Sequence, residues 1–238
     1  EAPWLQIVGT DDTPAPTASL WIFTQADRAA AAKGKGRPVG LLASADTLND
    51  TIEAAVECAA DLILIDAAGA SVDPRAELTH PPAISLLKDT VDRLLRHRRL
   101  GAIDLVFHGG VRTGSDGAKL IALGASAVAL GVAAHIAAGT RLEDANPFAD
   151  GAQPADASAA AVASLIRALT AEASMMARCC GKTKLHNLEP EDLRALSVPA
   201  SVATGVPLPG RGVTGDLAAT AGAPMPGNAG GIAAELRI

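Results

Sequence analysis

The residues best suited to chemistry lie close together near the middle of the chain. Gly109 and Gly110 directly follow a short apolar run at 103–107, and a helix-like stretch begins at Ser115. Glycines let backbone amides approach an anion without a Cβ in the way, and a helix N-terminus adds partial positive charge. This order predicts a phosphate-binding loop, although a glycine pair after a strand is also typical of an ordinary turn.

A second glycine loop follows at a short interval. Another apolar run at 127–130 comes after the helix-like stretch and ends at Gly131. In a (β/α)8 barrel, phosphate commonly binds at the loops after the last two strands. Arg112 and Lys119 add positive charge to this part of the chain, although a lysine in a first helical turn is more often solvated. The combination favours a phosphate site over two unrelated turns.

Two titratable side chains stand where predicted strands end. Asp66 follows the buried run at 62–65, and His108 directly precedes the glycine pair. Catalytic residues gather at the carboxyl ends of barrel strands, so Asp66 is the candidate catalytic residue. Both also have a purely structural interpretation, because Asp66 could cap the next turn and backbone groups could satisfy His108.

The composition argues against several classes of protein. A formal net charge of −6, 2% aromatic residues and the absence of tyrosine provide neither a positive surface for nucleic acid nor a platform for bases. No apolar run in the sequence approaches the roughly 20 residues that span a bilayer. The three cysteines, Cys58, Cys179 and Cys180, lack further ligands at metal-binding spacing. We therefore expect no nucleic-acid partner, no membrane partner and no metal site, and a cytoplasmic location.

The elements that position these residues alternate between strands and helices. Apolar runs predict strands at 39–42, 62–65, 103–107 and 127–130, and helical spacing predicts helices at 48–60, 83–98 and 115–123. Short apolar strands separated by helices imply a parallel sheet with right-handed crossovers.

The two ends of the chain are less regular. In the first 36 residues, apolar runs at 4–8 and 20–24 could form short strands. A long alanine-rich helix that ends near Gly181 and a short helix at 190–196 follow the regular part. We therefore divide the chain into three parts, namely an uncertain N-terminal segment (1–36), a barrel region (37–197) and a Gly-, Pro- and Ala-rich tail (198–238).

Two stretches of sequence resemble a known family. The sequence GGVRTGSDGAKLIALGASAVALG at 109–131 resembles strands seven and eight of the FMN-binding barrel of glutamate synthase, a relative of α-hydroxy-acid oxidases and inosine monophosphate dehydrogenases. The sequence AEASMMARCCGKTKLHNLEPEDLRAL at 171–196 resembles the closing region of that barrel and favours glutamate synthase over its relatives. With PVGLL at 38–42 and DLILID at 61–66, the resemblance covers about 38–197.

This resemblance implies a fold, a cofactor and a reaction. The fold is α/β, a partial or complete (β/α)8 TIM-type barrel, of which the chain covers mainly strands five to eight and the closing helices. The cofactor is FMN, and its phosphate is held by Gly109, Gly110, Gly131 and Val132, with Arg112 beside the loop. The reaction is flavin-dependent reduction to glutamate of the imine formed from 2-oxoglutarate and ammonia. Because half a barrel leaves a sheet edge uncovered, we expect a homo-oligomer, a partner subunit or a larger polypeptide to complete it.

Three features depart from the family pattern. Leu42 stands where the family has a lysine close to the flavin ring, Asp-Ala-Ala-Gly-Ala-Ser at 66–71 replaces a glycine-rich loop, and 139–155 has no cysteines for an iron–sulfur cluster. These departures favour a first alternative, a non-catalytic flavin-binding or regulatory subunit. A second alternative is another phosphate-binding barrel of the hydroxy-acid oxidase type, although no histidine base or cysteine nucleophile stands out after residue 42 or 66.

Overall fold

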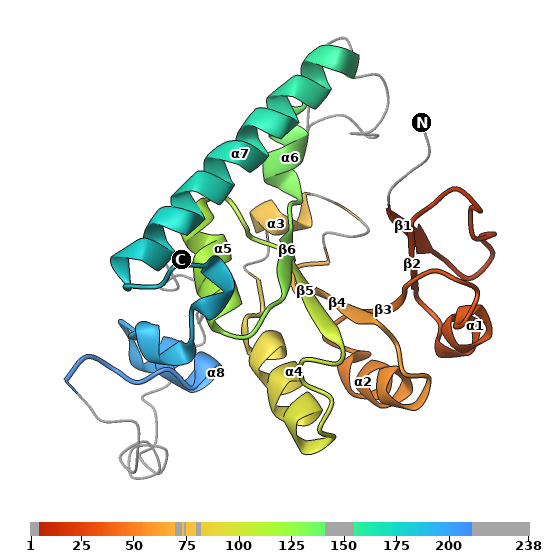
Figure 1. The fold of residues 1–238 in the computed structure, drawn as a ribbon, viewed down its shortest axis with the longest axis horizontal. Helices are drawn as coiled ribbons and strands as arrows, with labels where there is room; N and C mark the ends of the chain where they lie inside the picture. Colours follow the sequence, from red (N-terminus) through yellow and green to blue (C-terminus); the bar gives the residue numbers. More distant parts are fainter. Residues whose placement is uncertain (1–4, 70–72, 74, 80–81, 141–154, 211–238) are drawn as a thin grey trace.

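A curled sheet of six parallel strands organises the protein. The computed structural model describes residues 5–69, 73, 75–79, 82–140 and 155–210. The strands lie in sequence order and are β1 (Leu5–Val8), β2 (Leu20–Phe23), β3 (Val39–Ala43), β4 (Leu62–Asp66), β5 (Asp104–His108) and β6 (Ala127–Ala129). Each strand pairs in parallel with its neighbour, and β1 and β6 form the two edges. The sheet is therefore part of a (β/α) barrel wall, open between β1 and β6 (Figure 1).

Helices connect consecutive strands from β2 onward. They are α1 (Ala26–Ala32), α2 (Leu48–Glu57), α3 (Ala76–Thr79), α4 (Ser85–Arg96) and α5 (Gly114–Ala122), and α6 (Val132–Ala137) follows the last strand, β6. The C-terminal part adds α7 (Ala155–Cys179), the 3-10 helices η1 (Leu185–Asn187) and η2 (Pro190–Asp192), and α8 (Val198–Thr204). This succession is the repeated strand–helix unit expected of a parallel sheet, because parallel neighbours need a crossover connection.

The alternation of side chains along the strands produces two apolar layers of unequal completeness. In β4, Ile63 and Ile65 belong to the large core between the sheet and its helices, whereas Leu62 and Leu64 belong to a smaller cluster on the inner face. At the β1 edge, Ile7 is 37% exposed. The outer layer is closed and the inner layer is not, as expected for a barrel that lacks part of its wall.

The structure confirms the predicted fold class and adds strands to it. All four strands predicted between 39 and 130 are present within one residue of their expected limits. The two apolar runs of the first 36 residues form β1 and β2, so the chain contributes six barrel strands. These two strands have only four residues each, which is too short for a clear alternating pattern.

The C-terminal segment differs from the sequence-based expectation. A helix was expected at 190–196, but only Pro190–Asp192 forms a 3-10 turn. Irregular chain was expected from 198 onward, but α8 occupies Val198–Thr204. The Ser197 side chain accepts a hydrogen bond from the Ala200 amide at its start, and Gly205, with φ of +73°, ends it. Seven residues make only about two helical turns, so α8 has almost no periodicity to detect. The rest of the predicted tail, 211–238, lies outside the described residues.

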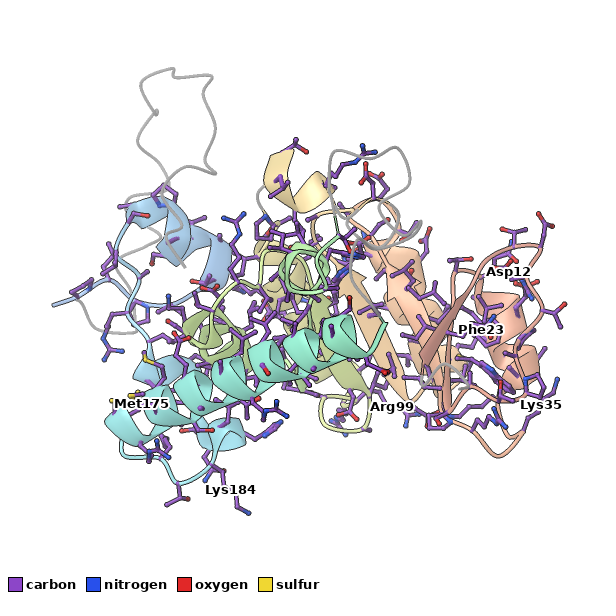
Figure 2. All side chains as sticks on the ribbon, turned by 90° about the horizontal axis from the view of Figure 1, so that it is seen from above. Asp12, Phe23, Lys35, Arg99, Met175 and Lys184 are labelled. Atoms are coloured by element: carbon purple, nitrogen blue, oxygen red, sulfur yellow. The ribbon has the colours of Figure 1, made fainter. Side chains whose placement is uncertain are left out.

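The long helix α7 packs along α5. By length and composition α7 could cross a membrane, although this is weak evidence, and the expectation of no membrane partner stays a prediction. Figure 2 shows that Met175 of α7 lies far from Asp12, Phe23 and Lys35 of the N-terminal part.

The helices α5 and α7 approach closely at Gly114, where an added Cβ would lie 2.2 Å from the carbonyl oxygen of Leu169. Glycine at this position is therefore required by packing.

Two neighbouring glycines of α5 give a matched test of this packing. We expect Gly114→Ala to lower the free energy of unfolding by about 1–3 kcal/mol, because the new methyl group forces α5 and α7 apart. Gly117→Ala should raise it by up to about 1 kcal/mol, because alanine favours a helix and its Cβ would lie 3.7 Å from Val128. Urea denaturation measures both values, and equal effects of the two substitutions would contradict the close contact.

Candidate functional site

The predicted site residues lie at the carboxyl edge of the last three strands. In the register of the sheet, Asp66 lies beside His108, and His108 lies beside Ala129. The next residues of the chain form the two glycine loops, and α3 lies at the same edge (Figure 1). The structure thus brings together all six residues predicted for the site, which are Asp66, Gly109, Gly110, Arg112, Gly131 and Val132.

The first glycine loop packs tightly against the segment that follows β4. Gly109 and Gly110 have φ of +124° and +71°, a backbone region that favours glycine. A Cβ on Gly109 would lie 3.0 Å from the Ala68 side chain, and one on Gly110 would lie 2.6 Å from Pro82. The two glycines are therefore required by the turn and by this packing, whatever else they bind.

The N-terminus of α5 is already satisfied by groups of the protein. The Thr113 side chain accepts from the Asp116 amide, and the Asp116 carboxylate accepts from the amides of Arg112 and Thr113. Glu172 of α7 accepts from the Gly114 amide at 2.8 Å and the Ser115 amide at 3.2 Å. An external anion could not use these amides without breaking the α5–α7 contact.

A buried carboxylate occupies the second glycine loop. The Glu77 side chain of α3 is fully buried, and its Oε1 accepts a hydrogen bond from the Val132 amide at 3.2 Å. A Cβ on Gly131 would lie 1.5 Å from the same oxygen, so the absence of a side chain at Gly131 makes room for it. The other carboxylate oxygen, Oε2, has no hydrogen-bond partner among the described residues. An internal anion thus holds the position predicted for a phosphate.

The Arg112 side chain fixes the backbone of the same glutamate. Its Nη2 donates to the carbonyl oxygen of Glu77 at 3.2 Å. The guanidinium therefore connects the loop after β5 to α3, and its cationic group lies near the site without pairing with the Glu77 carboxylate. Positive charge is thus available beside the loop, as expected from the sequence.

His108 lies between two buried carboxylates. Its Nδ1 is 3.6 Å from Oδ1 of Asp66, and its Nε2 is 3.8 Å from Oε1 of Glu77. Both distances allow attraction of a positive charge on the imidazole but exceed hydrogen-bond length. The described residues contain no group of three histidine, cysteine, aspartate or glutamate side chains suited to a metal ion.

Several backbone amides at this edge remain available. Those of Gly110, Val111 and Gly131 make no hydrogen bond to any described residue, and that of Val132 is held only by Glu77. Unpaired amides in glycine loops are the usual ligands of phosphate oxygens, and here Gly110 is partly exposed whereas Val111 and Gly131 are buried. The two loops therefore have the donors of an anion site.

Comparison with known proteins identifies this region. Residues 31–145 match the conserved region in glutamate synthase. A glutamate synthase large subunit-like protein of Rhizobium meliloti (strain 1021) is 33% identical over 192 residues, which are 66% of this chain and 43% of that protein. Residues 31–145 are thus similar to the glutamate synthase family. The chain spans less than half the length of that relative.

Solved structures of mandelate oxidase are similar to this chain in fold. Its complexes with benzoyl-formic acid and with 3,3-difluoro-2-hydroxy-3-phenylpropionic acid each match with a TM-score of 0.50 and 19% identity. Both matches cover 72% of this chain and 54% of the oxidase chain. At this level of identity the likeness concerns the fold, and it agrees with a partial barrel.

Two carboxylates of the site, Glu77 of α3 and Glu172 of α7, were not predicted from the sequence. Glu77 lies in the connection between 67 and 82, where no periodicity indicated a helix or a buried face. Glu172 lies on a predicted helix, but its partner amides are about 57 residues away in the chain. Neither contact has a local signal, because each depends on how distant segments pack.

His135 of α6 reports the charge at this site. Burial lowers the pKa of His135 below its usual value, while the Glu77 carboxylate raises it and His108 lowers it. We expect Glu77→Gln to lower the pKa of His135 further, because the substitution removes a negative charge that stabilises the imidazolium. An NMR titration of the imidazole measures this pKa, and Glu172→Gln should leave it unchanged. An unchanged pKa of His135 in Glu77→Gln would mean that the Glu77 carboxylate does not lie near His135 in solution.

Proposed function

We propose that this chain is the FMN-binding oxidoreductase part of a glutamate synthase-type barrel. In this proposal, the chain would take part in reducing to glutamate the imine formed from 2-oxoglutarate and ammonia, and bound FMN would supply the electrons. The match of residues 31–145 to the conserved region in glutamate synthase carries the proposal. The two glycine loops at the carboxyl ends of β5 and β6 support it, because ligands of parallel barrels bind at this edge.

The residues at this edge fit a phosphate group. The fit rests on the Glu77 carboxylate, which shows that an anion can bind to the Val132 amide in the space beside Gly131. The loops of Gly109 and Gly110 and of Gly131 and Val132 would hold the FMN phosphate, and Arg112 would add positive charge. Bound FMN would supply two-electron transfer, and the chain would supply its position and surroundings.

Asp66 and His108 are the groups best placed to handle a proton. Reduction of an imine requires a hydride equivalent and a proton, and both side chains lie at the carboxyl ends of their strands, the edge at which ligands of parallel barrels bind. Asp66 attracts positive charge on His108 across 3.6 Å. We assign Asp66 the catalytic role expected from its position, with His108 as its proton-carrying neighbour.

Strands beyond the six of the described residues would have to cover the open part of the barrel. Both edge strands, β1 and β6, lack a further strand among the described residues, and Ile7 of β1 is partly exposed. Unpaired edges and an open apolar face favour association. We infer that a second copy, a partner subunit or a further segment of the same polypeptide completes the wall.

A second candidate function, flavin binding without catalysis, is favoured by Leu42. This residue lies on the inner face of β3 beside Leu64, within the small apolar cluster. The resemblance places a lysine here that stabilises negative charge on reduced flavin, and leucine cannot supply this charge. The acidic side chains of Asp66 and Glu77 at this edge would also repel a dianionic substrate such as 2-oxoglutarate.

Flavin binding tests the proposal directly. We expect added FMN to show quenched fluorescence and a shifted visible spectrum with the purified chain. Gly131→Ala should weaken FMN binding at least about tenfold, or 1.4 kcal/mol, because its Cβ would take the place of an anion oxygen. Gly117→Ala is the control, since it adds the same atom on the neighbouring helix, where the atom would make an ordinary van der Waals contact with Val128 at 3.7 Å. Unchanged affinity in Gly131→Ala would remove this loop from the site.

Turnover separates the two candidate functions. After anaerobic reduction of the bound flavin, addition of 2-oxoglutarate and ammonia should restore the oxidised spectrum if the chain is catalytic. A flavin that binds and stays reduced would favour the non-catalytic function. Absence of flavin binding in every condition would overturn both.

A further inference from the structure

We propose that Glu77 is an internal competitor for phosphate at this site. Its carboxylate holds the anion position at Val132 when no phosphate ligand is bound, and a ligand with a terminal phosphate enters by displacing α3. The identity of that ligand as FMN rests on the proposed function. The competition itself rests only on the geometry of Glu77, and it can be tested with inorganic phosphate.

The geometry makes the two occupants mutually exclusive. Oε1 of Glu77 accepts the Val132 hydrogen bond and lies 1.5 Å from where a Cβ of Gly131 would be. A phosphate oxygen that binds the same amide in the same space would overlap this oxygen. The nearby Nε2 of His108, at 3.8 Å, would face whichever anion is present. One site therefore serves either the carboxylate or the phosphate.

The energetics favour displacement over a structural role. Glu77 is fully buried, yet one oxygen accepts a single backbone hydrogen bond and the other has no hydrogen-bond partner in the described residues. Burying a charge with so few partners costs free energy that good geometry must repay. A carboxylate that moved into water would recover its hydration, which lowers the cost of displacing it. A glutamate kept only for stability would be better paired.

The attachments of α3 are compatible with its movement. The helix has four residues, two of which, Leu78 and Thr79, are exposed. The Arg112 side chain holds the Glu77 carbonyl, and short turns connect Asp73 with Ala76 and Arg75 with Leu78. By contrast, Glu172, another carboxylate that binds amides at this edge, belongs to the 25-residue helix α7. The Glu77 carboxylate, unlike that of Glu172, can leave without separating α7 from α5.

The test compares ligands with and without phosphate. We expect Glu77→Gln to bind FMN at least tenfold more tightly than wild type, and to bind riboflavin with unchanged affinity, because only the phosphate competes with the carboxylate. Glu172→Gln is the matched control and should give no gain for either ligand. Fluorescence titration measures all dissociation constants, and Glu77→Ala serves as a second variant if Glu77→Gln does not fold.

Thermal stability gives a readout that does not depend on flavin. Without ligand, Glu77→Gln should melt at the same temperature as wild type or higher, whereas Glu172→Gln should melt lower. Inorganic phosphate should raise the melting temperature of Glu77→Gln more than that of wild type. If no protein binds FMN but phosphate stabilises the variant preferentially, the proposed function fails and the competition stands. Equal FMN affinities, or equal responses to phosphate, would overturn the competition.

Discussion

The parallel register of β4, β5 and β6 is the constraint on which the site depends. It places Asp66 and His108 side by side and sends the chain out of the sheet into two neighbouring loops at one edge. Each strand contributes one or two polar groups or glycines at its carboxyl end, and none of them would meet without this alignment. A shift of one residue in the register would move Asp66 or His108 to the opposite face of the sheet, among the apolar residues of the outer core.

Carboxylates of the protein itself accept hydrogen bonds from both loops that lead into helices at this edge. The two carboxylates differ in burial and in the length of the helix that carries them. Glu172 is partly exposed and makes two hydrogen bonds to α5 from a helix that packs along it. Glu77 is fully buried, makes one hydrogen bond through its carboxylate and comes from a four-residue helix. The first arrangement stabilises tertiary packing. The second keeps in the interior a carboxylate oxygen without a hydrogen-bond partner in the described part of the chain, a feature that calls for a functional explanation.

The partial barrel explains why the two apolar layers differ. The outer faces of the strands are covered by helices of the same chain, so residues such as Ile63 and Phe107 are fully buried. The inner face would be covered by strands on the opposite wall, and the described chain has only six strands with two free edges. Ile7 and Leu42 therefore retain exposed surface that a completed barrel would remove from water. The position of any flavin ring would depend on the same completion.

The sequence by itself determined the parallel α/β fold, the strands between 39 and 130, and the two glycine loops. Short apolar runs and the glycines that follow them are local signals, so they can be recognised without the tertiary structure. The sequence was less informative for the short strands β1 and β2 and missed α8, since four to seven residues hold little periodicity. Only the tertiary structure decided that Glu77 lies against Gly131, that Glu172 binds the first amides of α5, and that His108 lies between two carboxylates. These contacts join residues that lie 31 to 58 positions apart in the chain. No local sequence pattern indicates which distant polar group fills the space that a glycine leaves by having no Cβ.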